Sequence, residues 1–427
     1  MGVEKMKKNR FLALTVFTIS SGFLATTLAI SPAVAQTEIT FWHAQSDGAG
    51  PKMIQDAVDR FEADNPTIKV VVSPVGADAI KDKIKVAIGA GSAPCIFPSW
   101  GGGVLNEYVK AGAVFPLNAY VKKDNYKNRF VPASWSNVTF SGAVYGIPVE
   151  NSAFAAIWYN KAIFKKYNLK PAKTWPELMT IVKTLNKAKI APFTLGGSSK
   201  WPSIMWYDYL VDRIDDDAFA KAALRSGGSF QDPAFIQAGK MIQDLVKANG
   251  FIKGYNGILY ENSVTPLYQG KAAMYLMGNW IYGQFVNDKK SNEYAFFNFP
   301  SVPGGKGDPS NVVGTIGDNY YSISANCPDK ENAFKVIQYL IDDKSVTSRI
   351  AQGRIPPVKG IKLTDPNTIE LNKIISSAKG VQLWWDQYLP AEFAELHKNE
   401  TAKLFGLSTT PEKMAAAQEA LARKILG

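Results

Sequence analysis

The chain has 427 residues, of which 46% are hydrophobic and 20% charged, so its composition is that of a globular protein long enough for two domains. Its formal net charge is +11, but Lys and Arg are scattered, with no run and no basic helix interleaved with aromatic residues. This disfavours a nucleic-acid partner and indicates a solvated basic surface, while a bias toward acidic ligands stays open.

Cysteine and histidine are too few for most catalytic or metal sites. The cysteines are Cys95 and Cys327, the histidines are His43 and His397, and neither pair is clustered in the sequence. A zinc site needs clustered ligands, and a serine or cysteine nucleophile needs a histidine partner. The glycine motifs that bind phosphates are missing as well. We therefore expect no cofactor, no metal and no enzymatic activity.

Residues 1–35 have the pattern of a cleaved secretory signal peptide. Basic residues precede an apolar run that opens at Phe11, and the segment closes on Ala33-Val34-Ala35, which is typical of a signal peptidase site. A transmembrane anchor is the alternative, but Thr, Ser and Gly dilute the apolar stretch. Residue 36 is Gln rather than a lipid-carrying Cys, so we expect an unanchored periplasmic protein. Residues 1–35 contribute +3, from four basic residues and one acidic, which leaves +8 after cleavage.

The first part of the expected mature chain alternates between strand and helix patterns. Apolar runs at 39–42, 68–75 and 95–97 are separated by amphipathic helical patterns over 51–64 and 78–88. Two such βαβ units predict a parallel sheet covered by helices. Ligands of these sheets bind beyond the carboxyl ends of the strands. At those ends the sequence has Trp42 with His43, and Trp100 before three glycines.

A second region begins near 145–150. It contains a buried-strand pattern at 155–159, helices at 175–187, 206–211 and 233–247, and a strand at 272–277 that ends at Gly278. Asn279 is expected to cap a helix with Trp280 at its first position. Later segments are a Pro/Gly-rich connection at 299–309, a strand at 320–324, a helix at 331–341, a break at 353–360 and a helix from Pro411.

Short motifs follow one another along almost the whole mature chain. They are Ile39-Thr40-Phe41-Trp42-His43; Gly146-Ile147-Pro148 with Trp158-Tyr159-Asn160-Lys161; Ala191-Pro192-Phe193 with Gly196-Gly197; Gly270-Lys271-Ala272-Ala273-Met274 with Gly278-Asn279-Trp280; and Pro303-Gly304-Gly305. In order and spacing, the chain resembles the extracellular solute-binding proteins of carbohydrate ABC importers, a family that includes maltodextrin-, raffinose- and xylo-oligosaccharide-binding proteins. The segment from Gln382 to Pro390 is most similar to the xylobiose- and chitobiose-binding branch.

The resemblance implies a two-lobed periplasmic-binding-protein fold of the α/β class. Each lobe would be a mostly parallel sheet flanked by helices, and three hinge crossovers would join the lobes. Lobe one would comprise 36–148 and 300–352, and lobe two 149–299 and 353–427, with crossovers near Pro148-Val149, Asn298-Phe299 and Gly353-Arg354. The family's strand order would also bring Cys327 near Cys95, which implies a disulfide in the oxidising periplasm.

A sugar site needs aromatic rings that stack on the ligand's C–H faces, with carboxylates, amides or Arg for its hydroxyls. The candidate ligand-binding residues are Trp280, Trp42, Trp100, Trp384, Glu150, Asn151, Asn279, Asp318, Asn319, Asp386, Arg354 and His43. Structural roles stay open for some of them: packing for Trp42 and Trp100, bracing of the hinge for Glu150 and Arg354, and a hydrogen-bonded structural histidine for His43. Of the adjacent Trp384 and Trp385, one is expected to face the cleft, and we favour Trp384.

We therefore expect a monomeric component of an ABC importer that captures a di- or oligosaccharide between its lobes and delivers it to membrane permease subunits. One alternative is a binding protein for acidic oligosaccharides such as oligouronides, which the +8 charge favours. The other is a secreted glycoside hydrolase with paired carboxylates such as Glu150 and Asp386.

Overall fold

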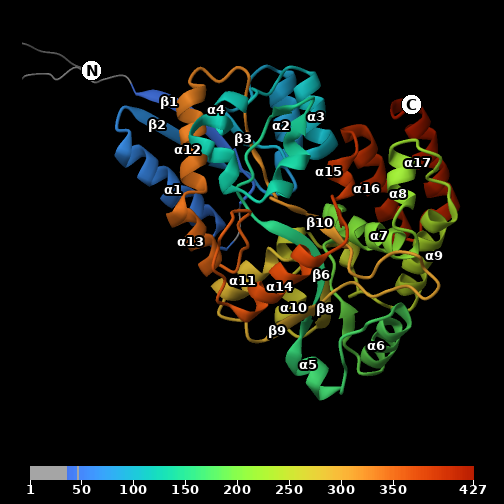
Figure 1. Ribbon diagram of the computed structural model, residues 1–427. Helices are drawn as coiled ribbons and strands as arrows, with labels where there is room; N and C mark the ends of the chain where they lie inside the picture. Colours follow the sequence, from blue (N-terminus) through green and yellow to red (C-terminus); the bar gives the residue numbers. More distant parts are fainter. Residues whose placement is uncertain (1–35, 46–47) are drawn as a thin grey trace, which may run out of the picture. The chain divides into compact units, whose positions relative to one another are not determined.

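Two α/β lobes, each with its own sheet and hydrophobic core, make up the described part of the chain (Figure 1). The structure is a computed structural model that describes residues 36–45 and 48–427, so the expected signal peptide lies outside the described residues. Within those ranges, no helix combines the length and apolarity that crossing a bilayer requires.

The sheet of lobe one has the strand order β11–β3–β1–β2, with β1 (Thr37–His43), β2 (Ile68–Pro74), β3 (Ile96–Pro98) and β11 (Tyr321–Ile323). As the sequence predicted, β1 is parallel to β2 and β3, whereas β11 is antiparallel to β3. The parallel pairs form because amphipathic helices return the chain to the same edge. In α1 (Gly50–Asp64), for example, Ile54, Val58 and Phe61 form one buried stripe.

The remaining elements of lobe one cover this sheet. They are α2 (Ile80–Gly89), α3 (Gly102–Lys110), α4 (Asn118–Lys122), short 3-10 helices at Lys123–Arg129 and Pro132–Val138, the hairpin β4 (Thr139–Phe140) and β5 (Ala143–Val144), α12 (Lys330–Leu340) and α13 (Asp343–Ala351).

The sheet of lobe two is mixed rather than mostly parallel. Its order is β12–β10–β6–β8–β7, with β9 also paired to β6; the strands are β6 (Ser152–Asn160), β7 (Ala191–Phe193), β8 (Ala272–Gly278), β9 (Tyr294–Phe297), β10 (Val312–Ile316) and β12 (Val381–Gln382). The central strand β6 is antiparallel to β8, β9 and β10, and only β7–β8 and β10–β12 are parallel. The expectation of a mostly parallel sheet in lobe two is wrong, because β6 runs away from the hinge while β8 and β10 run back toward it.

Helices cover both faces of this second sheet. They are α5 (Lys161–Lys166), α6 (Trp175–Lys187), α7 (Trp201–Ile214), α8 (Ala218–Ala223), α9 (Pro233–Lys247), α10 (Thr265–Tyr268), α11 (Ile281–Asn287), α14 (Pro366–Ser377), α15 (Trp385–Tyr388), α16 (Ala391–Phe405) and α17 (Pro411–Ile425), with 3-10 turns at Gly197–Ser199, Tyr255–Gly257 and Tyr260–Asn262. The helix expected at 206–211 is longer and begins at Trp201.

The strand pairing moves one of the expected crossovers. Thr315 of β10 pairs with Ala153 of β6, so β10 belongs to the second sheet and the crossover expected near Asn298-Phe299 is wrong. The chain re-enters the first sheet only at β11, so the crossing segment is 317–320. There the Asp318 N–H donates to the Asn151 carbonyl at 2.6 Å, which binds this crossover to the first one. We therefore propose lobe bounds of 36–148 with 318–352, and 149–317 with 353–427.

The two cysteines form a disulfide within lobe one. It joins Cys95, at the start of β3, to Cys327, just past β11, across 232 residues of sequence. The Ser324 N–H also donates to the Cys95 carbonyl at 2.9 Å, so the disulfide reinforces a strand pair that already lies side by side.

Candidate functional site

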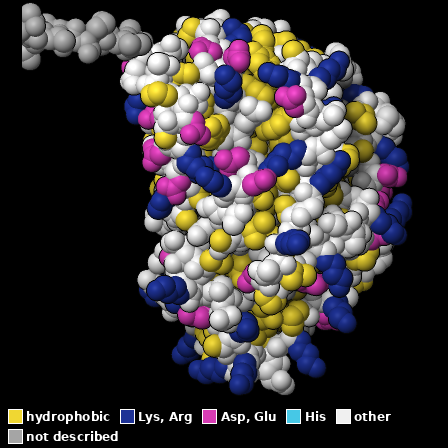
Figure 2. Space-filling view, turned by 60° about the vertical axis from the view of Figure 1, so that its left-hand side comes forward, with side chains coloured by type: hydrophobic (Ala, Val, Ile, Leu, Met, Phe, Trp, Pro, Cys, Tyr) yellow, Lys and Arg dark blue, Asp and Glu magenta, His cyan; other side chains and the backbone are white. Residues whose placement is uncertain are grey.

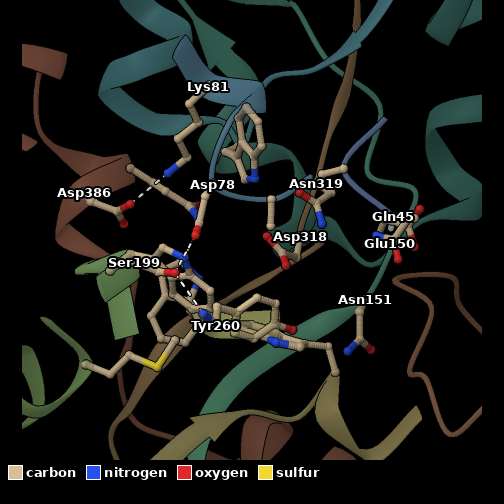
Figure 3. A pocket seen from close by; sticks show the side chains of 18 of the residues that line it. Gln45, Asp78, Lys81, Glu150, Asn151, Ser199, Tyr260, Asp318, Asn319 and Asp386 are labelled. Carbon is tan, nitrogen blue, oxygen red and sulfur yellow. Dashed lines mark hydrogen bonds and ion pairs between the residues drawn. The ribbon is translucent and has the colours of Figure 1, made fainter. Parts of the chain in front are cut away.

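A cavity of about 460 Å³ lies between the lobes and is lined by residues of both lobes and of the crossovers (Figure 3). At one end, Figure 3 shows Asp78, Lys81, Asp386 and Ser199 pointing toward one another. At the other end lie the hinge residues, including Glu150 and Asn151, with Gln45, Asp318 and Asn319 beside them.

Four aromatic rings form the lobe-two side of the cavity. The ring centroid of Trp280 lies 6.1 Å from that of Trp201 and 5.8 Å from that of Trp384, and Trp201 lies 4.7 Å from Tyr260. All four residues line the cavity. Trp385, by contrast, stacks on Phe219 at 4.0 Å in the core, so Trp384 is the cavity residue of that pair.

The sequence Gly278-Asn279-Trp280 fixes the central ring of this cluster. A Cβ on Gly278 would lie 2.1 Å from the Trp280 ring, so only glycine leaves room for the indole. Asn279 does not line the cavity and does not cap the next helix. Its amide instead donates to the Ser152 carbonyl at 3.1 Å and accepts from the Phe154 N–H at 3.2 Å, which ties the end of β8 to the start of β6.

On the lobe-one side, Trp100 faces the cavity directly after β3. Its φ of 53° lies in the left-handed region, which is strained for a bulky residue and is typical of binding sites. The glycines that follow allow lobe two to approach closely. A Cβ on Gly103 would lie 2.4 Å from the Tyr388 carbonyl oxygen, so α3 and α15 pack backbone to backbone across the lobes.

Two polar bridges cross the cavity between the lobes. Lys81 Nζ lies 2.7 Å from Asp386 Oδ2 and 5.2 Å from the centre of the Trp100 ring. Asp78 accepts hydrogen bonds from the Ser199 hydroxyl and, at 3.0 Å, from Trp201 Nε1. Burial alone would raise the pKa of Asp386, but the ammonium of Lys81 holds that pKa below its usual range. The bridging carboxylate is therefore ionised at neutral pH.

Glu150 is the centre of a buried charge network at the hinge. It is 1% exposed, and its carboxylate lies 3.1 Å from Arg349 Nη2 and 2.8 Å from Arg354 Nη1. Burial would raise its pKa, but the two guanidinium groups hold the pKa below its usual range. Glu150 touches the cavity, yet its charge is already neutralised, so it braces the hinge. Gln45 accepts a further bond from Arg354 at 2.8 Å.

Several residues that line the cavity carry buried side-chain oxygens. Asp318 is 9% exposed, and burial, together with the nearby charge of Glu150, raises its pKa to about 6. The side-chain carbonyl oxygens of Asn319, Gln352 and Gln387 are buried, line the cavity and accept no hydrogen bond from any described residue. A ligand that donates hydrogen bonds to these oxygens would satisfy them.

The structure places nine of the twelve candidate residues in the lining of this cavity. They are Trp280, Trp100, Trp384, Glu150, Asn151, Asp318, Asn319, Asp386 and Arg354. Asn279, Trp42 and His43 do not line it. Trp42 lies within β1, where it pairs with Ser73 and packs against the lobe-one core, because the strand extends one residue beyond it. His43 is buried behind the hinge, and burial lowers its pKa.

Sequence reasoning missed several lining residues, among them Asp78, Lys81, Trp201 and Tyr260. Asp78 and Lys81 had a usable signal, since the start of α2 follows the carboxyl end of β2 at the edge where ligands bind. Trp201 is the first residue of α7 and Tyr260 the first of a 3-10 turn, and no strand end indicated the position of either.

The cavity offers aromatic surfaces for stacking and polar side chains for hydrogen bonding. No cluster of three or more His, Cys, Asp or Glu suited to a metal occurs among the residues the structure describes. The carboxylates Glu150 and Asp386 are each neutralised by basic side chains. This arrangement suits a ligand with flat apolar faces and hydroxyl donors.

Comparisons with known proteins agree with this geometry. An uncharacterised ABC transporter extracellular-binding protein of Pyrococcus horikoshii is 26% identical over 283 residues, which is 64% of this chain and 63% of that relative's length. An sn-glycerol-3-phosphate-binding periplasmic protein of Brucella abortus is 29% identical, covering 68% of this chain and 76% of its own.

A solved structure reported for xylan utilization by Caldanaerobius polysaccharolyticus is 33% identical, covers 91% of this chain and 100% of its own, and superposes with a TM-score of 0.85. The model of the bacterial extracellular solute-binding protein family matches residues 44–347, most of the described chain. The chain is therefore a member of the bacterial extracellular solute-binding proteins.

Proposed function

We propose that this protein captures a neutral di- or oligosaccharide in the interlobe cavity and delivers it to the membrane permease of an ABC importer. The main support is the aromatic cluster around Trp280, which lies in the same cavity as Trp100 of the other lobe, together with amide and carboxylate side chains. Pyranose rings fit such a site, because their C–H faces stack on indole rings while their hydroxyls donate to the oxygens.

Several stacking surfaces within one cavity support a ligand of more than one sugar ring. Trp201, Trp280 and Trp384 present rings tilted to one another by 50° and 69°, so they cannot all stack on a single flat face. The first solved relative, described with xylan utilization, supports the same class.

Among the described residues that line the cavity, three of the four cations are paired with carboxylates, and Lys200 is bonded to a neutral amide. Lys81 is bound to Asp386, Arg354 to Glu150, Lys398 to Glu395, and Lys200 to Asn399 at 2.8 Å. An oligouronide or a phosphate ester could pair with Lys200, but it would have to displace a carboxylate to pair with Lys81, Arg354 or Lys398 and would also meet the carboxylate of Asp318. This favours a neutral sugar over the acidic alternative.

The proposed capture of the ligand depends on contacts that both lobes make with it. A ligand between Trp100 and Trp280 touches both lobes at once only when they are together, so binding favours the closed arrangement. The permease would then receive the closed complex. We propose that the exported protein acts as an unanchored periplasmic monomer.

The test is the melting temperature of the exported protein with neutral xylo- and chito-oligosaccharides, oligouronides and glycerol phosphate, with sugar analysis before and after. We expect a rise with a neutral oligosaccharide that is recovered intact. A rise in melting temperature only with an acidic ligand would show that the protein binds acidic ligands instead of neutral sugars. Cleavage products would indicate a glycoside hydrolase. No rise with any sugar would contradict the proposal.

A further inference from the structure

Most of the chain's excess positive charge comes from one segment. Residues 161–190 contain eight lysines, no arginine and one acidic residue, Glu177, so they contribute +7 to the formal net charge of +11. Residues 1–35 contribute another +3, which leaves the rest of the chain almost neutral. Apart from Lys165-Lys166 the lysines are not consecutive, and for that reason the charge looked scattered in the sequence.

The fold gathers these lysines at one end of lobe two. We call them the lysine face; they are Lys161, Lys165, Lys166, Lys170, Lys173, Lys183, Lys187 and Lys189. They lie on α5, on α6 and on the segments that flank α6. Figure 2 shows Lys and Arg side chains gathered at the lower end of the molecule, where Figure 1 places α5 and α6.

The charges of the lysine face are not neutralised within the protein. All eight side chains are exposed, and none forms an ion pair with any residue in the described ranges. The single carboxylate of the segment, Glu177, instead accepts the backbone N–H of Lys173 at 2.7 Å. Elsewhere exposed lysines do find partners, such as Lys240 with Glu412 at 3.1 Å.

The lysine face is separate from the ligand cavity, since none of its residues lines that cavity. It also lacks the features of a site for a specific anion. Lysine is a hydrated point charge rather than the planar fork that holds one phosphate or carboxylate. Trp175, the tryptophan of the segment, is half-buried and packs on Phe299 at 6.2 Å, so it offers no platform for bases.

A broad field of solvated lysines suits a broad anionic surface. The headgroups of anionic phospholipids attract clustered lysines from within about one Debye length, roughly 10 Å at 0.1 M salt. We propose that the lysine face adsorbs reversibly to a bilayer surface that carries anionic phospholipids. Adsorption would hold the loaded protein at the membrane where a permease lies, while the separate cavity stays free for its ligand.

The test compares binding of the exported protein to vesicles of phosphatidylcholine alone and to vesicles with equal parts of phosphatidylcholine and phosphatidylglycerol. We expect binding to the anionic vesicles only, and its loss as salt is raised. The variant Lys165→Gln/Lys166→Gln/Lys170→Gln/Lys173→Gln should bind them about 100- to 1,000-fold more weakly.

A matched control removes the same charge elsewhere: Lys122→Gln/Lys123→Gln/Lys344→Gln/Lys362→Gln, four exposed lysines outside the lysine face. It should bind as the wild type does, and both variants should keep the ligand-induced thermal shift. The proposal is overturned if the wild type ignores anionic vesicles at low salt, if the two variants weaken binding equally, or if soluble polyphosphate binds while the vesicles do not.

Discussion

Trp280 is the central ring of the proposed ligand contact. Its ring lies between those of Trp201 and Trp384, and Gly278 leaves it the space it occupies. Truncating a central aromatic anchor typically costs about 2 kcal/mol or more of binding free energy.

We expect Trp280→Ala to weaken binding of the captured oligosaccharide by about 30-fold or more in a calorimetric titration. Trp42→Ala is the control, because Trp42 packs outside the cavity and should affect stability rather than affinity. Equal losses of affinity in the two variants would contradict this assignment.

The Asp318 carboxylate is expected to lower the free energy of unfolding of the empty protein while it contributes to ligand binding. Its pKa is about 6 in the folded protein against about 3.9 when unfolded, so the folded state binds more protons between these values. By linkage, its contribution to the free energy of unfolding falls as pH rises through this window, and the ionised carboxylate destabilises the empty protein at pH 7.

Asp318→Asn should therefore raise the free energy of unfolding at pH 8 by about 1 to 3 kcal/mol, with little effect near pH 3. The same variant should bind the sugar more weakly, because a charged acceptor is lost. Urea unfolding at both pH values, with titration of the ligand, checks this. A variant that is less stable at pH 8 would show that the carboxylate has a structural partner.

Some cavity residues could be predicted from their position in the sequence, and others could not. Trp100 was predictable because it follows a parallel strand, and Glu150 because it lies on a crossover motif. Trp42 was misplaced, since a strand end read from sequence is uncertain by a residue or two and β1 extends through His43. Trp201 reaches the cavity through tertiary packing of a loop-to-helix junction, which no local periodicity encodes.

At the scale of elements, the hinge is held by the Glu150 network. Arg349 and Arg354 come from α13 and the third crossover, while Glu150 comes from the first, so one carboxylate joins two connections between the lobes. Removing one partner of a buried ion pair leaves an uncompensated charge, which typically costs about 3 to 5 kcal/mol.

Glu150→Gln should lower the free energy of unfolding by about that amount in chemical denaturation. Glu412→Gln, which breaks an exposed pair with Lys240, should change it little. If Glu150→Gln unfolds like the wild type but loses ligand affinity, Glu150 is a ligand acceptor rather than a brace.

The sheets were predictable to different degrees. The βαβ alternation of residues 37–98 follows from local amphipathic patterns, and the structure has the parallel pairs that these patterns predict. The sheet of lobe two is assembled from segments as distant as β6 and β12, and its antiparallel pairs depend on long-range packing. Strand β10 was missed for this reason, and with it the position of the second crossover.

At the scale of the whole molecule, the disulfide closes a very long loop. It spans 232 residues and links strands that belong to one lobe. Cross-links of long loops typically stabilise a protein by about 2 to 5 kcal/mol, mainly by restricting the unfolded chain.

We expect Cys95→Ser/Cys327→Ser to lower the free energy of unfolding within that range while ligand affinity is retained, because neither sulfur lines the cavity. Thiol titration of the unreduced, denatured wild type provides the check. Two reactive thiols would refute the bond.

The proposed function requires both lobes to contact one intact oligosaccharide in the interlobe cavity. A crystal structure of the exported protein, grown with the sugar that gives the largest thermal shift, tests it most directly. We expect density for uncleaved sugar rings between Trp100 and the Trp280 cluster, with hydroxyls within hydrogen-bond distance of Asp318. An empty cavity with the sugar bound elsewhere, or density for cleaved products, would contradict it.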